Sequence, residues 1–373
     1  MFEADDGHGY NKTRRLAAYD WFGRWLKGAR DTDPEPQIEM ATPEELRCTP
    51  TGQVSTSLGG ESVFTLNQKR LEQLKANRLT RLGDLPGKVR EAIHYEPPSG
   101  PLQVTSYGTI TRPGYRIEKL IYESEPGIVI PSLLYVPDAG ASRRAAVLMV
   151  TGDGKASSVT EAEQFVTSGT VVLSIDARGT GETRVDTDVN SREFDHYFGD
   201  FSDIMTALLV GKTMAGMRAL DISRGVDLLT SRKEVDPNQV YGYGKDEGAL
   251  PLLYASVLDG RIRRVVLDGM LVSYESVVNS KVHRRILEGV APGMLKSYDL
   301  QDLVAALAPR NVWIVSGTDP MGHELANSEV KVAYRRALEA FSQQGAAQAI
   351  HIKDWRPGQD NTTFYGEFTA AIR

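Results

Sequence analysis

The sequence predicts an α/β protein in which helices cover both faces of a mostly parallel sheet. Three strand candidates come first and are separated by Pro and Gly turns, as in antiparallel hairpins: 102–111, 114–123 and 127–136. Short apolar runs then alternate with segments of helical pattern: 145–150, 170–176, 239–243, 263–269, 311–317 and 347–354. Near-continuous apolar strands spaced by helices are typical of a parallel sheet that is buried on both faces. An antiparallel start followed by parallel strands is the α/β-hydrolase architecture.

The composition is that of a soluble globular protein, with 373 residues, 41% apolar and 25% charged. A formal net charge of −6 argues against a nucleic-acid binder and against anionic membranes, so neutral or carbohydrate ligands remain. The single cysteine, Cys48, excludes an internal disulfide framework. The first ten residues lack a signal-peptide pattern, and no apolar run approaches the ~18 residues of a membrane span. We expect a soluble chain without an export signal, of unassigned compartment and without metal or cofactor.

The chain is predicted to have three parts. Residues 13–27 place aromatic and leucine side chains at helical spacing and end at Gly28. Residues 29–65 are polar and rich in Pro, Thr and Gly, which predicts a linker. The hydrolase-type domain then covers 66–373, with helices near 66–79 and 87–94 and a long helical stretch over 202–232.

The segment Val240–Ala249 reads as a buried strand that passes through a Gly-framed turn into a helix. This is the layout of a nucleophile elbow, G-x-Nuc-x-G, in which the flanking positions must lack a Cβ so that strand and helix can approach each other. Gly244 and Gly248 are the flanking glycines, and Asp246 stands in the nucleophile position. The sequence therefore predicts an elbow that presents a carboxylate.

Asp246 has three interpretations. Some hydrolases of this fold use Asp to attack an alkyl carbon, and a His-activated water then breaks the ester. Alternatively, the carboxylate caps the helix that begins near Glu247, where the dipole favours negative charge. The glycines at 242, 244 and 248 also imitate a dinucleotide fingerprint, with Asp268 beyond them, but such fingerprints normally open their domain.

The remaining catalytic candidates follow the chain order nucleophile, acid, histidine. Asp319, directly after the strand near 311–317, takes the acid position, and His323 lies four residues further on. The loop after the last strand, 355–363, contains no histidine, and His351 within that strand is expected to be structural. Predicted oxyanion N–H donors are Gly152 and Asp153 after the first parallel strand, and Glu247 after the elbow residue.

A weak internal repeat suggests where the catalytic histidine could come from. Residues 8–22 align with residues 358–372, so that Asn11 matches Asn361 and Thr13 matches Thr363. The match puts His8 opposite Gly358, where a hydrolase domain carries its histidine. Either the first 28 residues end a preceding hydrolase domain, or they supply His8 and a helix to this domain or to a second copy of it.

Segments LSIDARGTGETR (173–184), 214–249 and WIVSGTDP (313–320) resemble acetyl-xylan-esterase-type and dipeptidyl-peptidase-like α/β hydrolases over roughly residues 100–373. Residues 5–28 separately resemble the histidine loop and final helix of such a domain. The resemblance implies a Ser at position 246, an acid at Asp319 and a histidine at position 358, so this chain departs from it twice.

These observations give two functional expectations. The first is a protein of the carboxyl-ester hydrolase type, acting on acylated carbohydrate, whose catalytic triad is incomplete. The second is a non-catalytic module for binding or assembly. If a front domain is missing, the apolar stripe of the N-terminal helix would favour a homo-oligomer.

Overall fold

The computed structural model describes residues 2–5, 7–30, 35, 37–78, 84–138, 143–184, 201–354 and 368. The chain forms two compact units, Met1–Ser62 and Val63–Arg373. Each unit is described by itself. The assignment of residues 1–28 to the end of a preceding domain stays a prediction.

The first unit contains the predicted N-terminal helix. Helix α1 covers Lys12–Phe22 and continues as a π-helical turn, Gly23–Lys27, while a short α2 covers Val54–Ser57 within the predicted linker. The side chain of Asn11 caps α1 by accepting from the backbone N–H of Arg14 at 3.2 Å. Trp21, Phe22 and Trp25 are all exposed. Self-association through this aromatic stripe stays a prediction.

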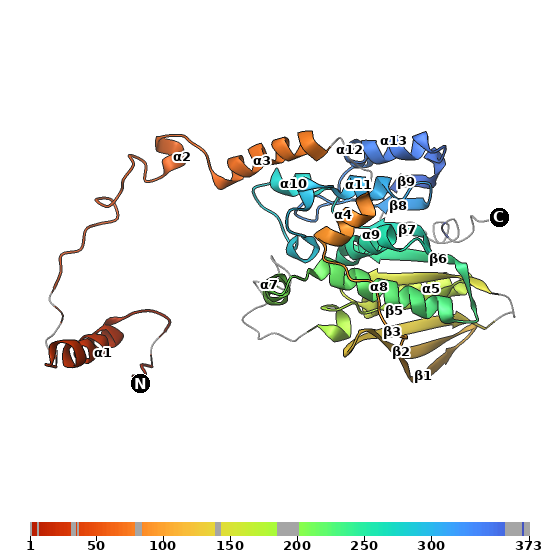
Figure 1. Ribbon diagram of the computed structural model, residues 1–373, viewed down its shortest axis with the longest axis horizontal. Helices are drawn as coiled ribbons and strands as arrows, with labels where there is room; N and C mark the ends of the chain where they lie inside the picture. Colours follow the sequence, from red (N-terminus) through yellow and green to blue (C-terminus); the bar gives the residue numbers. More distant parts are fainter. Residues whose placement is uncertain are drawn as a thin grey trace. The chain divides into compact units, whose positions relative to one another are not determined.

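The second unit is built on one sheet of nine strands, shown in Figure 1. Their bounds are β1 Val104–Arg112, β2 Tyr115–Glu125, β3 Ile128–Pro137, β4 Arg144–Thr151, β5 Val171–Ile175, β6 Val235–Lys245, β7 Ile262–Asp268, β8 Asn311–Val315 and β9 Ile350–Lys353. The spatial order is β1-β2-β3-β5-β4-β6-β7-β8-β9. The strands β1, β2, β3 and β5 pair antiparallel, and every later pairing is parallel. The predicted α/β-hydrolase fold is confirmed.

The chain reverses its direction of travel across the sheet at β4. After β4 it moves to β5 on one side, and after β5 it returns to β6 on the other side. In such sheets the carboxyl ends of the strands at the reversal point form a natural ligand crevice. The loops after β4 and β6 are therefore the expected position of a site.

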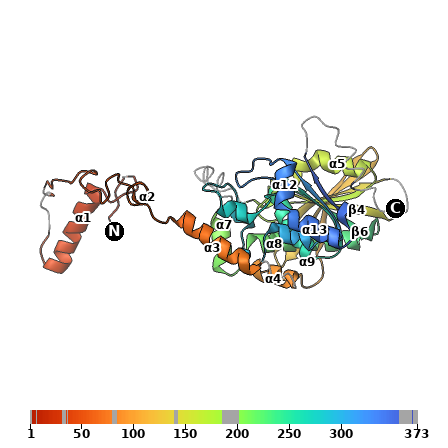
Figure 2. The ribbon, with the colours of Figure 1, turned by 90° about the horizontal axis from the view of Figure 1, so that it is seen from above.

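Helices cover both faces of the sheet (Figures 1 and 2). Helix α5, Val159–Thr167, lies on one face and packs against β3 and β5, whereas α8, Met214–Ser231, and α9, Ala249–Leu258, lie on the other face. The further helices are α3 Val63–Arg78, α4 Leu85–Ala92, α7 Phe201–Leu209, α10 Tyr274–Val278, α11 Leu300–Ala305, α12 Asn327–Ala333 and α13 Arg335–Gln343.

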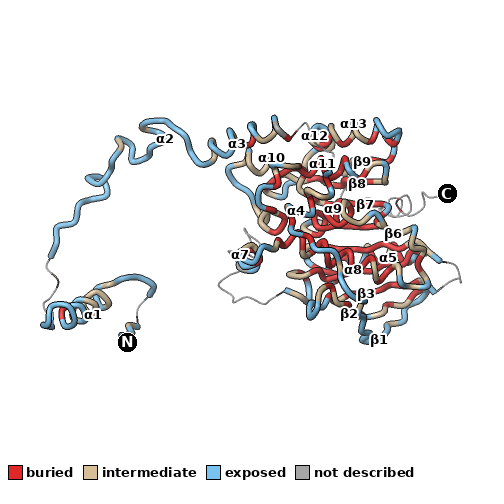
Figure 3. Tube along the Cα trace, in the orientation of Figure 1, coloured by how far each residue is buried: buried red, intermediate tan, exposed pale blue. Residues whose placement is uncertain are grey.

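Side-chain alternation along the strands divides the core into two layers. In β4, Val147 and Met149 join the cluster beside α5, while Leu148 and Val150 join the larger cluster beneath α8 and α9. Because successive side chains point to opposite faces, a strand buried on both faces must be apolar at every position. Figure 3 shows the central strands as buried along their length.

The structure corrects the predicted single helical stretch over 202–232, which is two helices. Helix α7 ends at Leu209, and α8 begins at Met214. Gly211 between them has φ +73°, a left-handed conformation that ends a helix, and the side chain of Thr213 caps α8 by accepting from Gly216 N–H at 3.0 Å. None of the described helices is long and apolar enough to cross a bilayer.

Candidate active site

The predicted bend is present at Asp246. Strand β6 ends at Lys245, one 3₁₀ turn covers Asp246–Gly248, and α9 starts at Ala249. Asp246 has φ +52°, a conformation that L residues rarely adopt. Its carboxylate is not a helix cap, because Gly248 is the N-cap residue of α9 and no side chain caps that helix.

The two flanking glycines are required by the close approach of strand and helix. A Cβ on Gly244 would lie 2.6 Å from the Cα of Ala249, and a Cβ on Gly248 would lie 2.3 Å from the carbonyl oxygen of Val150. Both neighbouring atoms belong to the backbone, so neither can move aside as a side chain would. The glycine spacing thus serves the geometry of the turn, as the elbow pattern requires.

The side chain of Asp246 is exposed on the wall of a pocket of about 310 Å³. Acidic side chains dominate the charged lining of this pocket: Asp153, Asp246, Glu247, Glu288 and Asp319. Arg284 and Arg285 supply the positive charge. Apolar side chains form much of the rest of the wall: Leu250, Met270, Leu271, Tyr274, Ile286 and Met321. Apolar walls with a few convergent polar groups are typical of small-molecule sites.

The surroundings of Asp246 raise the pKa of its carboxyl group. Although solvent reaches the side chain, the pocket walls replace much of the bulk water, and this desolvation is the largest cause. Lys245 and Arg285 lower the pKa, while the negative charges of Asp153 and Glu161 raise it. The ammonium group of Lys245 is itself paired with Glu161 at 2.9 Å. The positive charge of Lys245 is therefore shared between Glu161 and Asp246. It does not cancel the rise in the Asp246 pKa that desolvation causes.

The predicted oxyanion donors lie beside the elbow, in the turn after β4 and at Glu247. The N–H of Gly152 donates to the carbonyl of Lys245 at 3.2 Å, so this donor is already used. Asp153 and Glu247 both line the pocket. The Glu247 carboxylate pairs with Arg285 at 3.0 Å.

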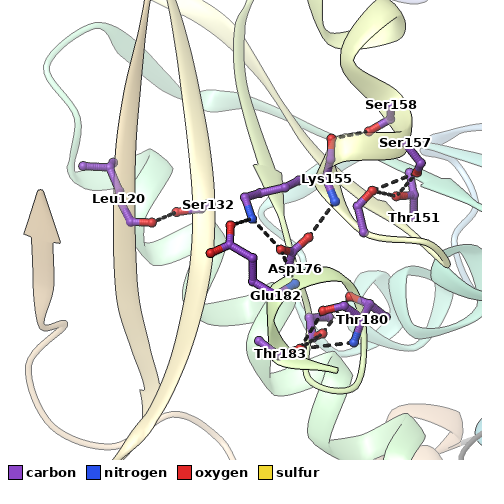
Figure 4. A network of polar contacts seen from close by, with 12 residues as sticks. Leu120, Ser132, Thr151, Lys155, Ser157, Ser158, Asp176, Thr180, Glu182 and Thr183 are labelled. Atoms are coloured by element: carbon purple, nitrogen blue, oxygen red, sulfur yellow. Dashed lines mark hydrogen bonds and ion pairs between the residues drawn. The ribbon is translucent and has the colours of Figure 1, made fainter. Parts of the chain in front are cut away.

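A buried ion pair holds the turn that carries Gly152 and Asp153 (Figure 4). The Lys155 ammonium group contacts the Asp176 carboxylate at 2.5 Å, with 8% and 1% of these side chains exposed, and it also contacts Glu182. Asp176 follows β5 and also accepts from the backbone N–H groups of Lys155 at 2.6 Å and Glu182 at 2.9 Å. Asp176 therefore joins the loop after β4 to the loop after β5.

Gly154 and Gly181 permit this contact, because a Cβ on either would lie 2.7 or 2.3 Å from Asp176 Oδ1. Sequence reasoning missed both Lys155 and Asp176. The available signal was a charged residue ending an apolar strand at 170–176, followed by glycines.

Asp319, the predicted acid, contacts the imidazole of His323, a pairing that was not predicted from the sequence. His323 Nδ1 lies 3.1 Å from Asp319 Oδ2, and the other carboxylate oxygen accepts from the backbone N–H groups of Met321 at 2.8 Å and His323 at 2.9 Å. Burial would raise the pKa of Asp319, but these hydrogen bonds outweigh it and lower the pKa. Asp319 lines the pocket, whereas the His323 side chain is 76% exposed and does not line it.

The other described histidines lie elsewhere. His351 in β9 stacks on Trp313 with ring centroids 4.1 Å apart, in agreement with the structural role expected for it. His94 and His283 are exposed, and His8 is exposed within the first unit. His196 and the loop 355–363 lie outside the described residues. Within the described part of the second unit, no imidazole is hydrogen-bonded to the Asp246 carboxylate, and the roles predicted for His8 and His323 stay predictions.

The described side chains form no group of three or more His, Cys, Asp or Glu that could hold a metal ion. The seven charged residues of the pocket come from loops after four different strands, β4, β6, β7 and β8. Arg285 was not predicted as a site residue, because its contact with Glu247 joins loops that are distant in the chain.

Several esterases of known structure share this fold. A "putative acetyl xylan esterase" from Bacteroides fragilis NCTC 9343 has a TM-score of 0.63 at 17% identity and covers 86% of this chain and 88% of its own. An acetyl xylan esterase from Paenibacillus sp. R4 has a TM-score of 0.52 at 17% identity, over 80% of this chain and 96% of its own. A glucuronoyl esterase from Solibacter usitatus has a TM-score of 0.52 at 14% identity, over 90% of this chain and 98% of its own.

Sequence comparison adds one curated relative and no family model. "Putative hydrolase YtaP" of Bacillus subtilis (strain 168) is 27% identical over 104 residues, which is 28% of this chain and 35% of that protein. The match thus spans about a third of the length of the relative. The second unit therefore has the same fold as these esterases.

Proposed function

We propose that the pocket of the second unit recognises an acylated carbohydrate, and that Asp246 takes the place of the hydroxyl nucleophile of an ester hydrolase. The observation that carries the proposal is the strained conformation of Asp246 at the junction of β6 and α9, on the wall of the pocket. A positive φ at a non-glycine residue is costly and is a reason to look for function at that residue. The structural neighbours, which are esterases named for xylan and glucuronoyl esters, support the ligand class.

The chemistry of Asp246 argues against the ordinary serine route. A serine gives its proton to a histidine as it attacks the acyl carbon, whereas an ionised carboxylate has no proton to give. A carboxylate that formed an ester would need a water activated by an imidazole to release it. We therefore propose that binding persists and that turnover is absent or very slow.

The direct test combines binding with turnover. Calorimetry with acetylated xylobiose should show binding to the wild type and weaker binding to Leu250→Trp, in which a larger side chain fills the pocket. Hydrolysis of p-nitrophenyl acetate should stay at background for the wild type, Asp246→Ala and His8→Ala. Absence of any acetylated-xylobiose binding would refute the proposal, and turnover that disappears in Asp246→Ala would refute its non-catalytic part.

A second candidate is a hydrolase that uses Asp246 together with the pair Asp319–His323. The 3.1 Å contact between the carboxylate and the imidazole favours it, since an acid orients a histidine in this way in catalytic triads. In that case His323→Ala and Asp246→Ala should abolish the same activity, while His94→Ala, at another exposed histidine, should leave it unchanged. If the wild type already shows only background hydrolysis, this candidate fails.

A further inference from the structure

The side chain of Glu247 lies next to the elbow, between the turn after β4 and the loop that carries Arg285. Its Oε2 atom lies so close to Gly152 that a Cβ on that glycine would be 2.1 Å away. On its other side, Oε1 lies 3.0 Å from Arg285 NH1. The carboxylate is thus fixed between the turn after β4 and the Arg285 loop, inside the lining of the pocket.

One of the predicted oxyanion donors already has a partner in this arrangement. The Gly152 N–H donates to the carbonyl of Lys245. Burial raises the pKa of Glu247, and the opposing charge of Arg285 offsets this effect only in part. A hole that stabilises a developing oxyanion needs donors aimed at that oxygen. Here the Glu247 carboxylate lies beside Gly152, one of the three predicted donors.

We propose that Glu247 determines the specificity of this pocket: its carboxylate, held by Arg285, excludes anionic groups from the oxyanion position and favours ligands that offer hydroxyl donors. The inference deepens the proposed function, because carbohydrate hydroxyl groups can donate to a carboxylate that acts only as an acceptor. It also gives a second reason, independent of Asp246, for the absence of ester hydrolysis. Charges a few ångströms apart at a partly buried site interact strongly enough to decide which ligand binds.

The test uses two probes, methylphosphonate as an anionic oxyanion mimic and acetylated xylobiose as a neutral hydroxyl donor. Glu247→Gln keeps the size of the side chain and removes its charge, which also releases Arg285 from its ion pair. At pH 7 this variant should bind methylphosphonate at least tenfold more tightly than the wild type and acetylated xylobiose more weakly. Glu161→Gln is the matched control, because it removes a charge from the elbow region at a residue outside the pocket lining.

Two outcomes overturn the inference. One is equal affinity of the wild type and Glu247→Gln for methylphosphonate, including the case in which neither binds. The other is the same gain in Glu161→Gln, which would show that net charge alone is responsible. If Glu247→Gln does not fold, Arg285→Met replaces it. That variant retains the carboxylate and should still exclude methylphosphonate, so tight binding of the anion by Arg285→Met would refute the inference.

The two proposals fail in different ways. If acetylated xylobiose binds no variant, the proposed carbohydrate ligand is wrong, while the methylphosphonate measurements still decide the role of Glu247. If Glu247 had only a general structural role, Glu247→Gln would bind both probes more weakly than the wild type. Only the proposed role reverses the preference between them.

Discussion

The two sides of the pocket differ in what they keep of a hydrolase. On the elbow side, backbone geometry is tightly determined, by glycines at 244 and 248 and by the buried Lys155–Asp176 pair, while the side chain at the nucleophile position is an aspartate. On the β8 side, an aspartate and a histidine are present at 3.1 Å, but they belong to a local turn whose imidazole is 76% exposed. The constrained turn and the carboxylate–imidazole pair thus lie on different sides of the pocket.

The difference teaches that an elbow is maintained by packing as well as by catalysis. The turn at Asp246 lies between the central strand β4 and helix α9, so its shape is needed for the core whatever side chain it presents. The turn of Asp319 carries little of the core, and its contacts are satisfied by its own neighbours. The predictions that follow compare the two sides, from the largest expected effect to the smallest.

Breaking the buried pair on the elbow side should have the largest effect. Asp176→Asn leaves the Lys155 ammonium group buried without its main counter-charge, which should cost about 3 to 5 kcal/mol of unfolding free energy. Urea denaturation measures the loss. Glu182→Gln is the matched control, because that carboxylate contacts the same ammonium group but is 70% exposed, and it should cost less than about 1 kcal/mol. Equal losses would show that burial of the pair does not determine its contribution.

Adding a methyl group at the elbow should destabilise the protein for steric reasons alone. Gly248 has φ −79°, which suits any residue, yet a Cβ would lie 2.3 Å from the Val150 carbonyl oxygen. We expect Gly248→Ala to lower the unfolding free energy by about 2 to 3 kcal/mol. Gly260→Ala is the control, since nothing lies within 4 Å of its added Cβ, and it should change stability little. A stable Gly248→Ala protein would mean that strand and helix are free to separate.

On the β8 side, Asp319→Asn should cost only about 1 kcal/mol at pH 7, because two backbone N–H groups would then donate to a neutral amide oxygen and not to a charged carboxylate, in a partly solvated place. The folded-state pKa of Asp319 is lowered, so its contribution is present above the ordinary carboxyl pKa and is lost as the pH falls through the folded value. Denaturation curves of the two proteins should therefore converge at acidic pH. A difference that grows on acidification would contradict the direction of this pKa shift.

The smallest effect concerns the protonation of Asp246. Its pKa is raised, with desolvation as the main cause. Removing the positive charge in Lys245→Met should raise this pKa further, and removing the negative charge in Asp153→Asn should lower it. Carboxyl-carbon NMR titration would measure both. Shifts of the same sign in the two variants would indicate a change of shape and not of charge.

The sequence predicted the sheet well, because its signals are local. The β4 strand was expected at 145–150 and is Arg144–Thr151, and the antiparallel start followed by parallel strands was also correct. The split between α7 and α8 was missed, although Gly211 and the capping Thr213 marked it. Helical periodicity on both sides concealed a break of four residues.

For the candidate site, the sequence located what depends on spacing and missed what depends on contact. The bend at Asp246 followed from two glycines four residues apart. The Lys155–Asp176 pair, and the contact of Glu247 with Arg285, join segments brought together only by folding. Periodicity and motif spacing carry no information about such pairs.

The division of the pocket among loops after β4, β6, β7 and β8 has a consequence for engineering. The turns after β4 and β6 are held by the core and by the Lys155–Asp176 pair, whereas the loops after β7 and β8 are the ones to exchange as modules. A designer could install Asp246→Ser and, separately, graft a loop that carries an imidazole, and could ask at which step hydrolysis first emerges. A fold of this kind is a practical host for rebuilding an enzyme one loop at a time.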